Sequence, residues 1–202
     1  MAKNPMFNIQ YGLFVVTTEF EGKDNGCITN TCIQVTAEPN RISVAINKAN
    51  YTNELLQKSG FVTVSIISEK ADFELFKHFG FQSGRDVNKF ADFNDCKRLA
   101  NGTLAVTKGT NAYISGKVCQ MIDLGTHTLF IIDVTEAETL TDDASATYNY
   151  YQANNKPKPQ PLKKTVWRCS ICGYEYEGEE IPDDFICPWC KHPASDFVKV
   201  EA

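Results

Sequence analysis

The chain has 202 residues, 43% of them hydrophobic and 22% charged, enough to bury one full core and leave sequence for a smaller unit. No apolar run approaches the roughly 20 residues that a membrane helix needs, and residues 1–5 do not resemble a signal peptide, so we expect a cytoplasmic protein with no membrane contact. Residues 166–202 hold three basic and eight acidic residues and so carry the whole formal charge of −5, which argues against nucleic acid and fits either docking on a basic protein or simple solubility.

The first 140 residues contain mostly β-strand patterns. One short helix is predicted to begin at Asn50 or Thr52 and run through Leu56, and a second to begin at Ser68 or Asp72 and end at Gly80. Many strands and few helices predict a mainly β fold, a closed or nearly closed antiparallel barrel with short helices. The predicted strands are residues 12–18, 27–36, 42–47, 61–68, 112–122 and 127–134.

Three polar segments of this region are candidate ligand contacts. The chain has neither a G-x-G-x-x-G nor a G-x4-G-K-[ST] motif, so any nucleotide must be held differently. Residues 25–36 are rich in small hydrogen-bonding side chains, which could hold a flavin or form a polar edge strand. Residues 48–52 lead into a helix and could bind phosphate there. Residues 83–90 place an arginine and a lysine around a glycine, and this segment could either clamp a diphosphate or form a solvated loop.

A linker is expected at residues 152–165, between a domain of residues 1–151 and one of residues 166–202. Lysine and proline alternate in residues 156–161, and no apolar periodicity is present. Alternating prolines favour extended polyproline II. The stretch should therefore act as a semi-rigid spacer that lets the small domain reach a surface.

Eight cysteines are present, and four of them form two C-x2-C pairs near the C-terminus. Two such pairs complete a tetrahedral four-sulfur site that suits iron or zinc. Nearby aromatic residues favour iron, although in a zinc ribbon they would serve as a miniature core. The scattered Cys27, Cys32, Cys96 and Cys119 are predicted to be small reduced hydrophobes. The predicted metal ligands are Cys169, Cys172, Cys187 and Cys190.

The C-terminal motifs resemble rubredoxin. They are Trp-Arg-Cys-x2-Cys-Gly-Tyr-x-Tyr at residues 167–176 and Ile-Pro-Asp-Asp-Phe-x-Cys-Pro-x-Cys at residues 181–190, followed by Asp196-Phe197. The resemblance implies one iron on four cysteines. A single iron stores one electron and cannot accept a hydride. If a nicotinamide feeds this site, the chain needs a second cofactor that takes two electrons together, a task suited to flavin.

The order of segments in residues 7–150 resembles the flavin reductase family. The marks include Tyr-Gly-Leu-Phe-Val-Val-Thr-Thr at residues 11–18, Ser-Gly-Arg-Asp at residues 83–86 and Gly-Thr-His-Thr-Leu-Phe at residues 125–130. The resemblance implies FMN in a homodimeric split β-barrel, with no side chain needed as acid or base. His127 would be a structural group or a flavin contact. The implied FMN contacts are Thr29, Asn30, Thr31, Cys32, Lys48 and Thr52, and the implied phosphate or nicotinamide contacts are Ser83, Arg85 and Lys89.

The two parts together resemble the high-molecular-weight rubredoxins of anaerobic bacteria. The resemblance implies that NADH or NADPH reduces FMN and that the iron relays electrons to a flavodiiron protein, which reduces oxygen or nitric oxide. One alternative is a flavin reductase that releases reduced FMN to a separate oxygenase. Another is a non-catalytic flavin-binding adaptor with a zinc ribbon.

Overall fold

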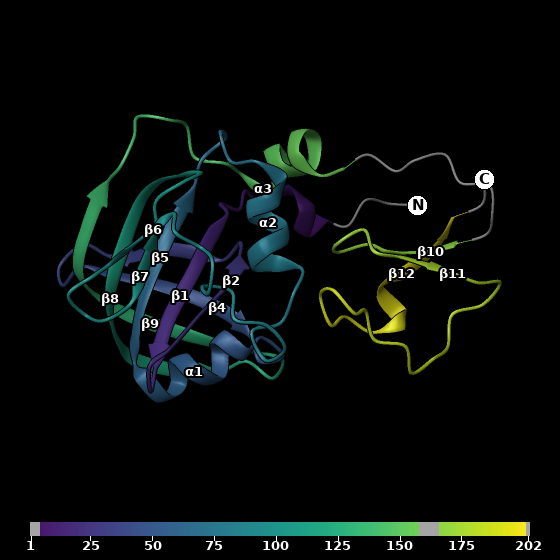
Figure 1. Cartoon of the computed structure of the whole chain (residues 1–202), viewed down its shortest axis with the longest axis horizontal. Helices are drawn as coiled ribbons and strands as arrows, with labels where there is room; N and C mark the ends of the chain where they lie inside the picture. The colour runs from purple at the N-terminus through teal and green to yellow at the C-terminus, as the bar shows by residue number, and fades with distance from the viewer. Residues whose placement is uncertain (1–4, 158–165, 201–202) are drawn as a thin grey trace.

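The computed structural model describes residues 5–157 and 166–200, which form a barrel followed by a small C-terminal domain (Figure 1). The 3-10 helix η1 (Pro5–Asn8) precedes the barrel. The barrel elements are β1 (Phe14–Phe20), β2 (Lys23–Thr29), β3 (Cys32–Thr36), β4 (Arg41–Asn47), α1 (Tyr51–Ser59), β5 (Phe61–Ile67), α2 (Phe73–Gly80), β6 (Cys96–Arg98), β7 (Leu104–Val106), β8 (Thr110–Asp123) and β9 (His127–Thr139). The mainly β fold with short helices is as predicted.

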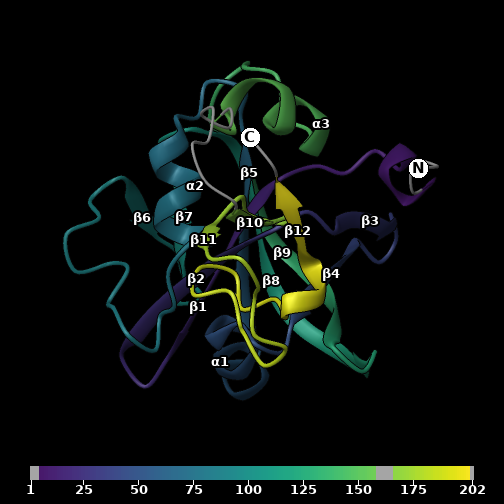
Figure 2. The same ribbon diagram turned by 90° about the vertical axis from the view of Figure 1, so that its right-hand side faces the viewer.

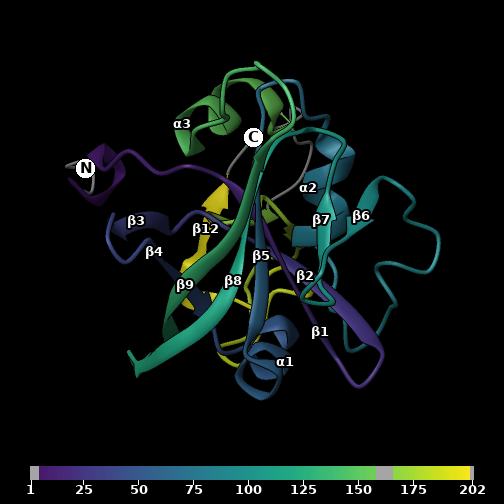
Figure 3. The ribbon, with the colours of Figure 1, turned by 90° about the vertical axis from the view of Figure 1, so that its left-hand side faces the viewer.

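Seven strands form one antiparallel sheet in the order β2-β1-β5-β8-β9-β4-β3, which Figure 3 shows from the side of β8 and β9. The prediction of a single strand over residues 27–36 is wrong, because the chain breaks at residues 30–31 into β2 and β3. These two strands lie at opposite edges of the sheet. The hydroxyl groups of Thr29 and Thr31 both donate to the Ala45 carbonyl at 2.9 Å, so the break brings the two edges together.

Strand β1 is buried on both of its faces because two hydrophobic clusters meet across it. Phe14 and Val16 belong to the cluster inside the barrel, together with Val44, Val64 and Phe130. The alternate residues Leu13 and Val15 belong to a second cluster, in which they pack with side chains of α2. Successive strand residues point to opposite faces, so one strand supplies both cores.

The two helices follow the predicted boundaries closely. Asn50 occupies the N-cap position of α1, and Gly60 ends the helix with a left-handed φ of 71°, which glycine adopts at no steric cost. Asp72 caps α2 by accepting a hydrogen bond from the Leu75 amide at 3.1 Å. Helix α2 then buries Phe76 and Phe79 against the barrel, which places its C-terminal end beside the cavity described below.

The chain leaves the barrel through α3 (Tyr148–Tyr150) and the π-helix η2 (Tyr151–Asn155). Residues 152–155, which we expected in the linker, are therefore helical, and Tyr151 packs into the second cluster of the barrel. Residues 158–165 of the expected linker lie outside the described residues. Over the described ranges we found no helix with the length and apolar character required to cross a membrane.

The C-terminal domain is a three-stranded antiparallel sheet in the order β11-β10-β12, with the 3-10 helix η3 (Ala194–Asp196) before its last strand. The strands are β10 (Val166–Cys169), β11 (Glu175–Glu177) and β12 (Phe197–Val200). Its core consists of three buried cysteines and Phe197, with aromatic side chains packed around them. Figure 2 shows this domain in front of the barrel. Five aromatic residues were predicted around the sulfurs; Tyr174, Tyr176, Phe185 and Phe197 pack there, whereas Trp189 is 41% exposed.

Candidate functional site

A cavity of about 460 Å³ lies between the barrel and the C-terminal domain. Its volume falls in the range of pockets for small-molecule cofactors, and its wall mixes aromatic side chains with hydroxyl, amide and backbone groups, the composition such pockets usually have. The β2–β3 break, the start of α1 and the end of α2 provide the barrel side. Of the ten predicted binding residues, those that line the cavity are Thr29, Asn30, Thr31, Thr52, Ser83, Lys89 and His127.

The polar side of the cavity is held by hydrogen bonds between segments distant in sequence. Asn25 is buried, and its Nδ2 donates to Oγ1 of Thr52 at 3.1 Å, linking β2 to α1. Gly84 lies directly against Asn25: a Cβ at this position would be 2.0 Å from Asn25 Oδ1. The glycine of the Ser83-Gly84-Arg85 segment is therefore required by the close approach of the loop to β2.

Lys89 is a buried cation at this cavity, with only 4% of its surface exposed. Its Nζ donates to the carbonyls of Gly26 at 2.8 Å and Phe79 at 2.9 Å, so it joins β2 to the last turn of α2. Burial lowers the pKa of Lys89 to about 8. An ammonium group has three N–H donors, and the two carbonyls use two of them, so a third can be offered to a ligand.

Three of the predicted contacts lie away from the cavity lining. Lys48 Nζ is 2.6 Å from Asp123 Oδ1. Arg85 is 2.8 Å from Glu54 Oε2, and its guanidinium lies 4.7 Å from the centre of the Tyr51 ring. Cys32 packs against the barrel core, where burial raises its thiol pKa to about 12. Both cations meet carboxylates of the same chain, so the structure uses them to join elements.

His127 lines the cavity at the start of β9. Its Nδ1 is 2.9 Å from the hydroxyl of Thr126, within hydrogen-bond distance. Burial lowers the pKa of His127, and the positive charge that His192 can carry lowers it further. A structural role and a contact with the flavin, the two roles considered for His127 from the sequence, both fit this position. His192, which follows the second knuckle, lines the same cavity as His127.

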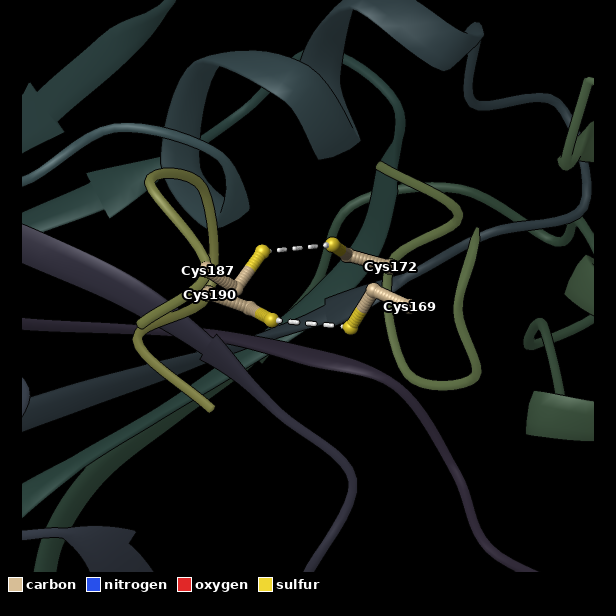
Figure 4. Close-up of side chains that lie close together, drawn as sticks. All are labelled: Cys169, Cys172, Cys187 and Cys190. Atoms are coloured by element: carbon tan, nitrogen blue, oxygen red, sulfur yellow. Dashed lines mark hydrogen bonds between the residues drawn. The ribbon is translucent and has the colours of Figure 1, made fainter. Parts of the chain in front are cut away.

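The four predicted metal ligands lie together between two loops (Figure 4). The Sγ atoms of Cys172 and Cys187 are 3.5 Å apart, those of Cys169 and Cys190 are 3.6 Å apart, and all four atoms lie within 4.8 Å of one another. A tetrahedral site with metal–sulfur distances of about 2.3 Å has sulfur atoms roughly 3.8 Å apart. The donor set therefore fits one iron or zinc ion.

The sulfur atoms perturb one another strongly. Hydrogen bonding to the neighbouring sulfurs lowers the pKa of Cys169, whereas the interaction with Cys169 raises the pKa values of Cys172 and Cys190. Four thiolates this close cannot all be charged without a cation between them. The geometry is that of a metal centre.

The sequence analysis missed the aromatic wall of the cavity and its C-terminal side. The aromatic residues that line the cavity come from four separate segments of the chain, and their sequence pattern indicates only that they pack in a core. The residues of the C-x2-C knuckles were assigned to the metal site alone. The barrel aromatics are Tyr11, Tyr51, Phe76, Phe79, Phe81, Tyr148 and Tyr151. The C-terminal side is formed by Ile171, Cys172, Trp189, Cys190, Lys191 and His192.

Solved structures with the same fold define the class of the barrel. The flavin reductase PheA2 in its native state has a TM-score of 0.61 at 23% identity, covering 89% of this chain and 100% of that chain. The flavin reductase HpaC complexed with NADP+ has a TM-score of 0.60 at 21% identity, covering 69% of this chain and 86% of that chain. The barrel thus has the flavin reductase fold.

Sequence comparisons extend this to both domains. The flavin reductase like domain matches residues 6–157, and the rubrerythrin, rubredoxin-like domain matches residues 167–198. A high molecular weight rubredoxin of Moorella thermoacetica is 31% identical over 221 residues, covering 94% of this chain and 96% of that protein. A ferric-chelate reductase (NAD(P)H) of Archaeoglobus fulgidus is 37% identical over 161 residues, covering 80% of this chain and 94% of that protein.

The chain belongs to the high-molecular-weight rubredoxin family, in which a flavin reductase domain is fused to a rubredoxin-like domain. It is an NAD(P)H-dependent oxidoreductase and a flavoprotein, with a C-terminal domain whose four cysteines imply iron. The flavin reductase domain and the rubredoxin-like domain of this electron-transfer fusion meet at the cavity described above.

Substituting Gly84 by alanine tests whether this cavity holds the flavin. The added Cβ would displace Asn25 and break its hydrogen bond to Thr52. We expect flavin affinity to fall about tenfold, roughly the loss of one hydrogen bond. Fluorescence titration of the protein after flavin removal measures the change. Gly80→Ala is the control for a methyl group added to the cavity lining without displacing Asn25, because Gly80 also lines the cavity and its Cβ would meet only Ile28, at 3.7 Å or more. Equal affinity in both variants would contradict the assignment.

Proposed function

We propose that this protein is a homodimeric cytoplasmic enzyme that passes electrons from NADH or NADPH through FMN to one iron, and from the iron to a flavodiiron protein. The overall reaction balances, since one reduced nicotinamide and two ferric sites give one oxidised nicotinamide, one proton and two ferrous sites. The flavin would supply the step from a two-electron donor to a one-electron acceptor.

The observation that carries this proposal is the shared cavity. Thr29, Thr52 and Lys89 line it from the flavin reductase domain, and Cys172 and Cys190 line it from the rubredoxin-like domain. A ligand bound there would contact Cys172 and Cys190, two of the four predicted metal ligands. Electron transfer needs such proximity, whereas a zinc ribbon used only for docking does not.

The residues of the chain would position the cofactors and exclude water. Thr29, Asn30 and Thr31 line the cavity from the β2–β3 break, and Ser83 lines it from the loop after α2. The buried ammonium of Lys89 would favour negative charge on a bound flavin. The described side chains at the cavity need not act as acid or base, because orientation and electrostatics suffice for hydride transfer.

The flavodiiron acceptor and the homodimer are both proposed from family resemblance. An exposed apolar edge strand also supports the homodimer. Strand β3 is an edge strand of the seven-stranded sheet, and Ile33 and Val35 on it are 66% and 43% exposed. An exposed apolar edge strand is a site at which another chain can pair. A second copy of this chain would cover it.

Replacing Ile33 with glutamate should therefore yield monomers. A charge buried in an interface without a partner costs several kcal/mol, so the dimer dissociation constant should rise at least about a hundredfold. Sedimentation velocity measures the oligomeric state. Val198→Glu is the control, because Val198 is also apolar and 54% exposed but lies in the rubredoxin-like domain. A monomeric wild-type protein would contradict the dimer, and a dimeric Ile33→Glu variant would contradict the placement of its interface at β3.

Anaerobic mixing of the purified protein with NADH tests the electron path. The visible bands of the flavin and of the ferric site should both bleach, the flavin first, and a flavodiiron protein should then restore them. The same measurement with NADPH determines the donor. Metal analysis of protein from the native host should find iron.

Other outcomes would favour other functions. Loss of the flavin during gel filtration would support a reductase that releases reduced FMN to an oxygenase. Zinc in natively produced protein, with no response to nicotinamide, would support the adaptor. Rapid reduction of a ferric chelate by the Cys187→Ser variant would indicate that chelates take electrons directly from the flavin, an acceptor suggested by the similarity to the ferric-chelate reductase of Archaeoglobus fulgidus.

A further inference from the structure

An aromatic stack joins the two domains at the cavity. Phe81 directly follows α2, and Trp189 lies between the last two cysteines. Their ring centroids are 5.3 Å apart and the ring planes differ by 10°. Phe81 also packs against the cysteine and aromatic cluster of the rubredoxin-like domain. The barrel thus contributes one side chain to the other domain's apolar surface.

A second contact lies at the first knuckle. Lys156, directly after η2, approaches Gly173 so closely that a Cβ there would be 3.4 Å from the lysine Cε. Both knuckles therefore touch the barrel domain, one through Lys156 and the other through Phe81.

The docked face is also the face through which electrons can reach the metal ligands. Cys169 and Cys187 are fully buried, whereas Cys190 is the most exposed of the four ligands. Cys190 lines the cavity together with Cys172. An external protein that approached the metal by the shortest route would use this same face, which the barrel covers here. Delivery to a partner therefore conflicts with docking on the barrel.

We propose that residues 166–200 form a removable cap on the flavin cavity, docked through the stack of Trp189 on Phe81, and that nicotinamide and the cap compete for the cavity opening. This inference rests on the proposed function and adds an order of events to it. The cap undocks when the nicotinamide enters the cavity. It then docks again and takes one electron from the flavin, and it undocks once more to deliver that electron to the partner protein. Because a hydride carries two electrons and one iron takes one, each nicotinamide requires two dockings.

The size of the contact is consistent with a reversible cap. Trp189 remains 41% exposed and Ile171 41% exposed in the docked state. Contacts of this kind between domains resemble transient interfaces, for which relative motion is expected. Loss of one aromatic pair should shift the docking equilibrium by about two- to tenfold.

The test compares Trp189→Ala with wild-type protein, using readouts that involve no electron transfer. Small-angle scattering of the metal-loaded protein should show a larger radius of gyration in the variant. After flavin removal, FMN should associate about two- to tenfold faster with the variant, because the cavity is open more of the time. Adding NAD+ to FMN-loaded wild-type protein should raise its radius of gyration toward the value of the variant. Val198→Ala, an exposed apolar position of the same domain, should behave as wild type.

Phe81→Ala removes the same stack from the barrel side and so controls for damage to the metal domain. Both single variants and the double variant should show the same increase in radius of gyration and in FMN association rate, because all three lose the same stack of Trp189 on Phe81. Unchanged scattering and association rates in both single variants, or NAD+ binding without any change in scattering, would overturn the proposal. Failure of NADH to bleach the flavin would refute the proposed function instead, and these readouts would still stand.

Discussion

Replacing Cys187 with serine is expected to remove the metal and unfold residues 166–200 while the barrel stays folded. Cys187 is fully buried, and three of the four residues in the core of this domain are cysteines. A domain of this size has too little apolar core to fold without its metal, and metal binding to such domains supplies on the order of 10 kcal/mol of folding free energy. Iron content and visible absorption should be lost.

The barrel provides an internal reference for this experiment. The hydrophobic clusters of the barrel contain no cysteine ligand, so its thermal unfolding should be unchanged. Cys119→Ser is the matched control, since Cys119 is exposed and a serine hydroxyl can keep its hydrogen bonds to the Ile131 carbonyl and the Asp133 carboxylate. Full iron content in Cys187→Ser would contradict the four-cysteine site. In that variant NADH should still bleach the flavin, because the hydride acceptor remains.

Replacing Lys89 with methionine should destabilise the barrel by about 2–5 kcal/mol, the cost of leaving two buried carbonyls without donors. The carbonyls of Gly26 and Phe79 lose their hydrogen bonds, and the end of α2 is no longer joined to β2. Flavin affinity should fall as well, since both segments line the cavity. Denaturant unfolding and flavin titration measure the two effects. Lys70→Met, at an exposed position, is the control.

The same variant should change the pH dependence of stability. The folded pKa of Lys89 is about 8, below the ordinary value of 10.5 that applies in the unfolded chain. Between these values the unfolded state binds more protons, so the free energy of unfolding should rise with pH, by at most about 1.4 kcal/mol per pH unit. Lys89→Met should lack this rise relative to wild type between pH 8 and 10. Parallel pH profiles would contradict the buried, shifted lysine.

Helix boundaries and metal ligands were predictable because they depend on near neighbours in sequence. Asp72 caps α2 through the amide three residues on, and each C-x2-C knuckle brings two sulfurs together by its own turn. The break between β2 and β3 was not predictable, because the same mixture of polar and β-branched side chains continues across residues 25–36, with no glycine or proline at residues 30–31. Its position depends on Ala45, the acceptor for the hydroxyls on both sides of the break.

Basic residues show the limits of the sequence most clearly. Lys48, Arg85 and Lys89 all looked like contacts for a phosphate or a nicotinamide. The structure pairs Lys48 with Asp123, 75 residues away, and Arg85 with Glu54, 31 residues away. Lys89 alone of the three lines the cavity, where it binds the carbonyl of Gly26, 63 residues away. The three cations have similar neighbours in sequence. Only the partner that each one meets from a distant part of the chain distinguishes their roles.

Periodicity, helix caps and cysteine spacing are local properties, so they predict a mainly β barrel with short helices and a four-cysteine metal site. The order of the sequence motifs supplies the resemblance to flavin reductases and rubredoxins. The tertiary structure decided which polar groups share the cavity and that the two knuckles form one of its walls. The physical reason is that sheet order and domain docking bring together residues such as Phe81 and Trp189, whose pairing depends on contacts between whole surfaces and leaves no periodic pattern in either segment.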